Sequence, residues 1–424
     1  MIKTLKILTV NVSDNSGGAA RAAYRIHQAV IACGVDGQFL VKNKTLSDNS
    51  VLTVDSFDRT YPFQNPIRYI RHKIKNKIQQ ARWRPYADRE DVFLSDLRSS
   101  SIHGALQKID FDIVHLHWIN LRFLDLRELR KLNKPIVWTL HDCWPFTGIC
   151  HYFYNCERYT QSCGSCPHLH STNTNDLSAQ VWKAKKQIYQ GLNMHIVTPS
   201  SWLANAARNS SLFGQFPVTV IPNPIDTNYF CPGSKMDACN ELHLNPTKNY
   251  ILFGAMNALS DRNKGFAEFK EAMQHFEQQY DHSNTEILIF GSTEAPEMNL
   301  TKIKVTNLGM LHNTNLLAAY RAAQVMVVPS LSENLSNVIM ESLSCSTPVA
   351  AFSIGGNADM IDHLQNGYLA KELDSKDLAK GIHFCLTNNA DNTLSEAARA
   401  KVVENFGMDT VGKVYMDLYS SISK

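Results

Sequence analysis

With 424 residues, the chain is long enough for two or three domains with large apolar cores, and this length excludes a small disulfide-stabilised protein. Apolar residues make up 44% and charged residues 19% of the chain, and 42 Lys and Arg against 39 Asp and Glu leave a net charge of +3, which disfavours dedicated nucleic-acid binding. No apolar run reaches the 18 residues of a membrane-spanning helix, and residues 7–12 are typical of a first strand rather than an export signal, so we expect a cytoplasmic protein.

Short β-branched runs alternate with longer amphipathic stretches, which predicts repeated βα units and parallel sheets. The expected strands cover residues 6–11, 37–42, 113–118, 136–140, 195–199, 218–221, 250–255, 286–290, 325–329 and 347–352. A polar stretch with Pro222, Pro224 and Pro232 separates two groups of strands, which indicates two doubly wound domains with a ligand cleft between them. Residues 410–424 have apolar side chains at helical spacing and predict a terminal helix that packs back on the N-terminal domain.

The first turn between a strand and a helix contains Gly17 and Gly18. Glycine lets the backbone approach a ligand closely, and the first amides of the following helix can bind an anion such as a phosphate. The spacing does not match the G-x-G-x-x-G dinucleotide pattern, and a tight turn without a ligand explains the two glycines equally well.

Residues 59–87 are strongly basic and contain no acidic residue. Isoleucines recur there at intervals of three or four residues, so a helix would have an apolar stripe and a basic face. This pattern predicts either contact with an anionic membrane through residues 67–84 or a solvated surface helix.

Two acidic residues mark a later turn between a strand and a helix. Glu333 lies in the turn after residues 325–329, and Glu341 lies within the following helix, which Asn334 or Ser336 can cap. Two carboxylates at this spacing can bind two hydroxyl-bearing groups while the helix N-terminus faces a negative group between them. A nucleotide sugar has this pattern, and Asn337 joins the candidate contacts.

An earlier turn, after the strand expected at 250–255, contains Arg262 and Lys264. Two cations in a polar loop can neutralise a diphosphate leaving group, whose negative charge grows as the bond to it breaks. Alone, this turn is a weak signal.

Together these motifs resemble glycosyltransferase family 4, the retaining enzymes of the GT-B fold. The likeness rests on the two glutamates eight positions apart after Pro329-Ser330, on Lys264-Gly265 and on residues 221–226. It implies an α/β protein with two doubly wound Rossmann-like domains that face a central cleft. Residues 1–222 would bind the acceptor and include a Cys-rich insert at 143–170, residues 223–409 would bind the nucleotide sugar, and residues 410–424 would form the terminal helix.

The implied activity is retaining, hexosyl-type transfer from a nucleotide sugar, with UDP- or GDP-sugars the preferred donors. The acceptor would be a glycan or a lipid-linked glycan in polysaccharide biosynthesis, reached at the inner face of the plasma membrane, and the transfer would need no metal. A nucleotide-sugar epimerase of similar fold and a non-catalytic sugar-nucleotide-binding scaffold are the alternatives.

In that family the first glutamate contacts the donor sugar and the second holds the ribose. His141, which follows the strand at 136–140, is similar to the family's active-site histidine beside the donor sugar. The resemblance therefore predicts His141 and Glu333 as catalytic residues. The predicted donor-binding residues are Gly17, Gly18, Arg262, Lys264, Asn334, Ser336, Asn337 and Glu341. The chain departs from the family where Gly-Arg is replaced by Gly254-Ala255, so Arg262 is expected to supply that cation. Residues 334–336 replace Gly-Phe-Gly, so contacts to the sugar are expected to differ.

A cysteine cluster follows His141. Cys163 and Cys166 have the spacing of half a zinc knuckle, and Cys150 and Cys156 can complete a structural site of four thiolates. The wide gap between the first two cysteines leaves disulfides and plain buried thiols as alternatives.

Overall fold

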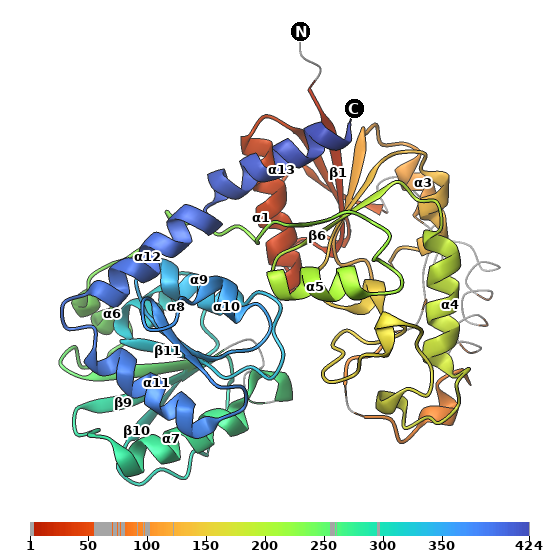
Figure 1. The fold of residues 1–424 in the computed structure, drawn as a ribbon. Coiled ribbons are helices and arrows are strands. Elements are labelled where there is room, and N and C mark those ends of the chain that lie inside the picture. Colours follow the sequence, from red (N-terminus) through yellow and green to blue (C-terminus); the bar gives the residue numbers. More distant parts are fainter. Residues whose placement is uncertain are drawn as a thin grey trace. The chain divides into compact units, whose positions relative to one another are not determined.

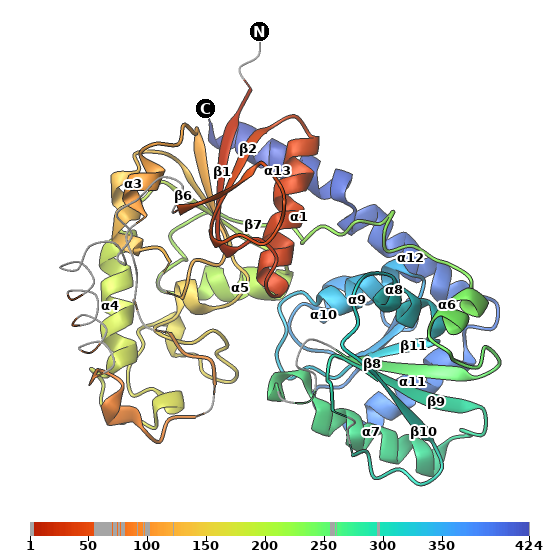
Figure 2. The same ribbon diagram turned by 180° about the vertical axis from the view of Figure 1, so that it is seen from behind.

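A computed structural model describes residues 4–54, 70, 74, 77, 81–90, 92–95, 97, 102–121, 123–254, 259, 261–294 and 297–423. The chain forms two compact units, one of residues 1–223 with 411–424 and the other of residues 224–410 (Figures 1 and 2). In the part of the chain described, no helix combines the length and the apolar character needed to cross a bilayer.

The first unit is built on a sheet of seven parallel strands. Its strands are β1 (Lys6–Ser13), β2 (Asp36–Asn43), β3 (Val51–Thr53), β4 (Ile113–Leu116), β5 (Ile136–Thr139), β6 (Met194–Thr198) and β7 (Val218–Val220). Its α-helices are α1 (Gly18–Ala32), α3 (His103–Leu106), α4 (Leu177–Tyr189), α5 (Ser201–Asn209) and, from the far end of the chain, α13 (Met408–Ile422). Short 3-10 turns cover Arg84–Tyr86, Leu126–Lys131, Trp144–Phe146, Arg158–Thr160 and Pro167–Leu169.

The second unit is built on a sheet of six parallel strands. They are β8 (Asn249–Gly254), β9 (Thr285–Phe290), β10 (Lys304–Gly309), β11 (Val325–Val328), β12 (Val349–Phe352) and β13 (Gly367–Ala370). The helices are α6 (Lys235–Glu241), α7 (Phe266–Gln279), α8 (Asn313–Ala322), α9 (Asn337–Ser344), α10 (Asn357–Met360), α11 (Ser375–Thr387) and α12 (Thr393–Phe406), with a 3-10 turn at Arg262–Lys264.

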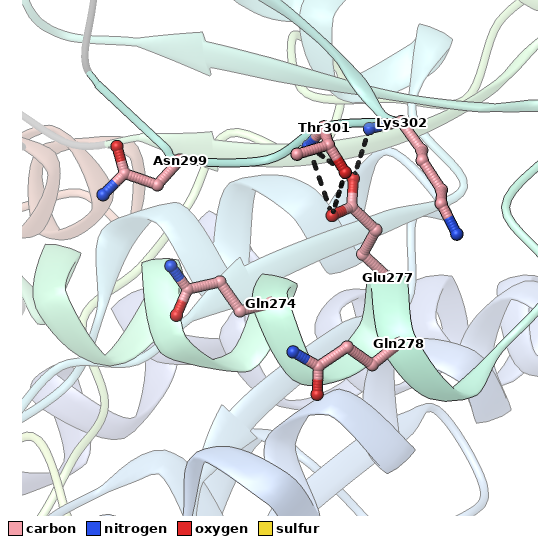
Figure 3. Close-up of a pocket in the computed structure, with 6 residues that line it drawn as sticks. All are labelled: Gln274, Glu277, Gln278, Asn299, Thr301 and Lys302. Atoms are coloured by element: carbon pink, nitrogen blue, oxygen red, sulfur yellow. Dashed lines mark hydrogen bonds between the residues drawn. The ribbon is translucent and has the colours of Figure 1, made fainter.

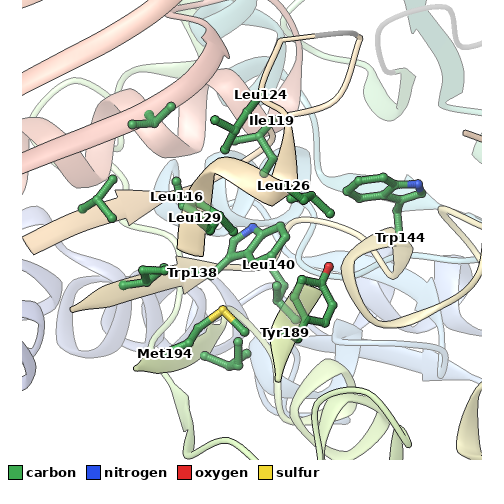
Figure 4. Close-up of a cluster of buried hydrophobic side chains, with 14 of the residues drawn as sticks. Leu116, Ile119, Leu124, Leu126, Leu129, Trp138, Leu140, Trp144, Tyr189 and Met194 are labelled. Atoms are coloured by element: carbon green, nitrogen blue, oxygen red, sulfur yellow. The ribbon is translucent and has the colours of Figure 1, made fainter. Parts of the chain in front are cut away.

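Both sheets bury apolar side chains on their two faces, because successive residues of a strand point to opposite sides. In β8, Leu252 belongs to one core cluster and Ile251 to the cluster on the other face. The largest cluster of the first unit surrounds Trp138, which packs edge-on against Tyr189 with ring centres 6.1 Å apart (Figure 4). Rigid two-sided sheets of this kind fix the positions of the loops at their strand ends.

The strand order of each sheet shows which of the loops at the strand ends can bind a ligand. The first sheet runs β3-β2-β1-β4-β5-β6-β7 and the second β10-β9-β8-β11-β12-β13, so the order reverses between β1 and β4 and between β8 and β11. In open parallel sheets, ligands bind beyond the carboxyl ends of strands at such switch points. Gly17 follows β1 and His117 follows β4, whereas Lys264 follows β8 and Glu333 follows β11.

Each of the ten expected strands overlaps a strand of the structure, and β3, β10 and β13 were not predicted. The basic segment lies mostly outside the described residues. Ile70 and Ile74, two described members of its apolar stripe, are 56% and 55% exposed.

Candidate functional site

Two loops meet at the switch point of the second unit. The Asn263 side chain donates a hydrogen bond of 2.6 Å from Nδ2 to the carbonyl of Ser332, and the amide of Leu331 donates one of 2.9 Å to the carbonyl of Asn263. These bonds join the turn after β8 to the turn after β11. Asn263 was not singled out from the sequence, since its role depends on a partner 69 residues away.

This junction brings Lys264 to Glu333, with Nζ and Oε2 3.5 Å apart and both side chains partly exposed. Attraction to the Glu333 carboxylate raises the pKa of Lys264 above its ordinary value, against the opposing effect of burial. The ammonium is therefore charged at neutral pH. Gly265, at φ +69°, allows this approach, because a Cβ there would overlap the carbonyl oxygen of Pro329.

Helix α9 (Asn337–Ser344) begins four residues after Glu333. Ser336 is its N-cap residue, and its side chain makes no capping hydrogen bond, while Oδ1 of Asn337 is buried without a hydrogen-bond partner. Amides at such a helix start carry partial positive charge and can bind an anionic group. Asn334 is buried beside them.

Glu341 lies just over one turn into α9 and is only 2% exposed. Its Oε2 accepts a hydrogen bond of 3.0 Å from the hydroxyl of Tyr320 on α8. The carboxylate is thus held in a fixed orientation by a residue that the sequence did not single out. Arg262 is exposed on the same 3-10 turn as Lys264. Ala255, where the chain departs from the family's Gly-Arg pattern, lies outside the described residues.

In the first unit, His141 follows β5 and lies beside His117, which follows β4. Nε2 of His141 and Nδ1 of His117 are 3.0 Å apart, and the two rings are stacked. Burial lowers the pKa of His141 to about 4 and that of His117 well below its ordinary value, so both rings are neutral at pH 7. His141 keeps part of its surface exposed, whereas His117 is enclosed.

The neighbour of His141 anchors the backbone at this point. The Asp142 carboxylate accepts hydrogen bonds from Nε1 of Trp118 at 2.7 Å and from the amide of Trp144 at 2.9 Å, and it lies 2.6 Å from Nδ1 of His151. Burial alone would raise the pKa of Asp142, but His151 and these donors lower it. Asp142 therefore remains an anion that fixes the turn carrying His141.

Gly17 and Gly18 open α1, as expected. Gly17 has φ +91°, and a Cβ there would meet no atom within 4 Å. The positive φ alone explains the glycine, so the structure leaves both the phosphate-binding and the tight-turn interpretations in place.

The structure gives no support to the predicted zinc site in the cysteine cluster. The described residues include no group of three or more His, Cys, Asp or Glu side chains that could hold a metal ion. Instead, Cys150 and Cys166 share a thiol hydrogen bond within a small apolar cluster, and Sγ of Cys163 accepts a 3.2 Å bond from the amide of Gly148. None of these three cysteines, nor Cys156, forms a disulfide, so the structure favours buried thiols.

A polar hollow in the second unit contains none of the predicted site residues. Gln274, Gln278 and Asn299 line it together with Glu277, whose carboxylate accepts backbone hydrogen bonds from Thr301 and Lys302 (Figure 3). The amide of Ile303 donates a further hydrogen bond to the same carboxylate. The Glu277 carboxylate thus links α7 to the segment before β10 through hydrogen bonds.

Two glycosyltransferase family descriptions match the chain. Residues 16–229, about half of its length, match the family described as Glycosyltransferase Family 4, and residues 248–388 match the one described as Glycosyl transferases group 1. The chain belongs to glycosyltransferase family 4. The family 4 match begins beside Gly17, and the group 1 match includes the Lys264 and Glu333 loops.

Curated relatives of this family 4 member share part of its length. A putative colanic acid biosynthesis glycosyl transferase, WcaC, of Escherichia coli strain K12 is 28% identical over 236 residues, covering 52% of this chain and 55% of the relative. The UDP-Gal:alpha-D-GlcNAc-diphosphoundecaprenol alpha-1,3-galactosyltransferase of Escherichia coli is 25% identical over 215 residues, covering 47% and 54%. The chain thus spans about half the length of these relatives.

Solved structures agree on the fold of this family 4 chain. Sucrose-phosphate synthase from Thermosynechococcus elongatus is 18% identical with a TM-score of 0.67, covering 99% of both chains. Anabaena HepE in complex with UDP-glucose is 16% identical with a TM-score of 0.63, covering 98% of this chain and all of the other. The two parallel sheets with their helices have the GT-B architecture that the sequence predicted.

Proposed function

We propose that the chain is a retaining glycosyltransferase of the hexosyl type, acting on a nucleotide sugar and a glycan or lipid-linked glycan acceptor in polysaccharide biosynthesis. The observation that carries the proposal is the junction of two loops at the switch point of the second sheet, which holds Lys264 3.5 Å from Glu333 beside the start of α9. Membership of glycosyltransferase family 4 supports it.

The donor side of the proposal follows from charge and position. Glu333 contacts the donor sugar, Lys264 and the first amides of α9 neutralise the diphosphate, and Glu341 binds the ribose. The bond from the anomeric carbon to the diphosphate oxygen breaks as a bond to the acceptor oxygen forms on the same face, and the acceptor proton passes to the leaving phosphate. Protein cations supply the charge that the leaving group needs, so we propose metal-independent transfer.

The relatives support particular substrates. One is named for colanic acid biosynthesis, another for a UDP-Gal donor and a diphosphoundecaprenol-linked acceptor, and HepE was solved with UDP-glucose. We therefore propose a UDP-sugar before a GDP-sugar, and an acceptor at the inner face of the plasma membrane. The basic residues and exposed isoleucines within residues 67–84 support peripheral contact there.

Calorimetry with UDP-, GDP-, ADP- and CDP-sugars tests the donor site. We expect the wild type to bind one nucleotide class and Glu341→Gln to bind it about tenfold or more weakly, because a hydrogen bond to a charged group contributes about 1.5–3 kcal/mol. Glutamine keeps the volume and an oxygen acceptor for Tyr320, so the fold should persist. Glu404→Gln, at an exposed position of α12, is the matched control and should bind like the wild type.

The outcomes separate the alternatives. A folded wild type that binds no nucleotide sugar refutes the transferase. Binding with conversion of the donor to an epimer in the absence of acceptor, followed by NMR of the sugar, would identify the epimerase. Binding without any turnover across a panel of acceptors would favour the scaffold.

A further inference from the structure

Three histidines meet at the carboxyl ends of β4 and β5. The ring of His117 lies between the other two, with its centre 4.2 Å from that of His115 and 5.2 Å from that of His141. His117 is 2% exposed, and its backbone is fixed by hydrogen bonds from its amide to the carbonyl of Val10 and from Nε1 of Trp138 to its carbonyl, both 3.0 Å. The ring of His117 therefore has little freedom to move.

One proton must lie between His117 and His141. Nδ1 of His117 and Nε2 of His141 are 3.0 Å apart, and in two neutral imidazoles one of these nitrogens donates and the other accepts. If His141 were the donor, His117 would carry its own proton on Nε2. That atom is buried and has no hydrogen-bond partner. A buried N–H without an acceptor is among the rarest features of folded proteins, so this arrangement is disfavoured.

We propose that His117 is a positioning residue that donates its Nδ1 proton to His141 and thereby fixes the tautomer and the ring orientation of His141. The proton of His141 then resides on Nδ1, so this atom donates a hydrogen bond to its partner and does not act as a base. The tautomer is independent of the enzymatic activity, whereas its consequence for sugar transfer rests on the proposed function.

Two tyrosines of the terminal helix α13 help to hold His115, the neighbour of His117, in place. The Tyr419 hydroxyl on α13 lies 2.6 Å from Nδ1 of His115, and Oγ1 of Thr139 lies 2.7 Å from Nε2. Tyr415, also on α13, places its hydroxyl 2.9 Å from the same Thr139 oxygen. Both ring nitrogens of His115 thus have hydrogen-bond partners, so its ring is fixed where it packs against His117.

Nitrogen NMR of the full chain labelled with ¹⁵N-histidine tests the proposal without substrate. Two-bond ¹H–¹⁵N spectra distinguish Nδ1–H from Nε2–H tautomers, and His117→Asn and His141→Asn identify the two signals among the 16 histidines. We expect Nδ1–H for both in the wild type. A wild-type His117 protonated on Nε2 would overturn the proposal, whatever the variants do.

The variants test the effect of His117 on His141. Asparagine places an N–H near the former Nδ1, so His117→Asn should keep the Nδ1–H form of His141, whereas His117→Leu should shift it to Nε2–H or to a mixture. An unchanged His141 signal in folded His117→Leu would contradict the proposal. His195→Leu, which removes a half-buried histidine of β6 in the same sheet, is the control and should leave the signal unchanged.

Activity supplies a second, separable readout. With the donor identified by calorimetry, His117→Leu should lower kcat about tenfold with KM within about twofold, and His117→Asn should restore most of it. Equal losses in both variants would show that His117 serves folding alone. If the wild type transfers no sugar, the proposed function fails, and the NMR result still decides the tautomer.

Discussion

Gly355 fixes the position of the Glu333 backbone. Its φ is +52°, an added Cβ would overlap the carbonyl oxygen of Glu333, and the amide of Gly356 donates a 3.2 Å hydrogen bond to that same oxygen. We expect Gly355→Ala to lower the free energy of unfolding by about 1–3 kcal/mol and to weaken nucleotide-sugar binding about tenfold, because the Glu333 loop must shift. Denaturant unfolding and calorimetry on the same samples measure both effects.

Substitution of a second glycine, Gly309, serves as a control that has the backbone strain without displacement of the Glu333 loop. Gly309 has φ +70°, and a Cβ there would meet no atom within 4 Å. Gly309→Ala should therefore cost stability through the left-handed backbone alone and leave nucleotide binding unchanged. Equal binding losses in the two variants would mean that the contact with Glu333 has no special part in donor binding.

At the scale of elements, helix α4 holds the loop that follows His141. Lys185 on α4 is fully buried, donates hydrogen bonds to the carbonyls of Trp144, Thr147 and Gly148, and lies 3.7 Å from the centre of the Trp144 ring. A single amino group thus contacts three carbonyls of one loop. Removing it leaves them without a donor, at roughly 1–3 kcal/mol for each buried group that finds no other partner.

We predict that the contribution of Lys185 to stability rises with pH. Burial lowers its pKa from 10.5 to about 7, so between these values the unfolded chain binds a proton that the folded chain does not. The free energy of unfolding of the wild type, relative to Lys185→Met, should therefore increase by about 2 kcal/mol from pH 7 to pH 9. Denaturant unfolding at both pH values measures it.

The neighbouring lysine provides the control for this titration. Lys186 is exposed on the same helix, so Lys186→Met should follow the wild type at both pH values. A difference between wild type and Lys185→Met that stays constant from pH 7 to pH 9 would show that the three carbonyls keep the ammonium charged with an ordinary pKa.

The strands that sequence patterns failed to predict share a position in the fold. The strands β3, β10 and β13 all lie at sheet edges, where a strand has only one neighbour. Edge strands carry more polar residues and weaker apolar patterns than central strands such as β8 and β11. Periodicity therefore identified the interior of each sheet and missed most of its borders.

Features of the candidate site that depend on neighbouring residues could be predicted from the sequence, whereas contacts between residues far apart in the chain could not. The turns that carry Glu333 and Lys264 were predictable because each follows a buried strand, a pattern visible in a few residues. Asn263 and Tyr320 were not, since their roles depend on Ser332 and Glu341, partners that only the folded chain brings near. The zinc prediction, which the described residues do not support, rested on cysteine spacing alone, and spacing does not determine which partner each sulfur meets.

For the whole molecule, the ends of the chain determine how the first unit is completed. Residues 411–424 return to it after the second unit, and Val411, Tyr415 and Tyr419 join a core cluster with Ile26 of α1. Gly412 permits this close approach, since a Cβ there would lie 2.7 Å from the carbonyl oxygen of Ala29. The first unit is thus built from segments that lie on both sides of the second unit in the sequence.

Charge is distributed unevenly over the whole molecule. Residues 59–87 hold eight basic and no acidic residues, whereas the rest of the chain has 34 basic against 39 acidic residues. The net charge of +3 thus conceals a basic segment in an otherwise acidic chain, and clusters of basic residues are attracted to anionic membranes. Ile70 and Ile74 are exposed there and could enter the lipid interface.

We expect replacement of Arg71, Lys73, Lys75 and Lys77 by glutamine to weaken binding to vesicles of phosphatidylglycerol and phosphatidylcholine at least tenfold. Each basic residue near an anionic surface contributes about 1 kcal/mol, and salt screens part of it. Replacing the exposed Lys302, Lys371, Lys376 and Lys380 changes the net charge equally and should leave binding unchanged. Vesicle sedimentation measures both. Equal losses would assign the binding to net charge, and no loss in the first variant would exclude the segment as the membrane contact.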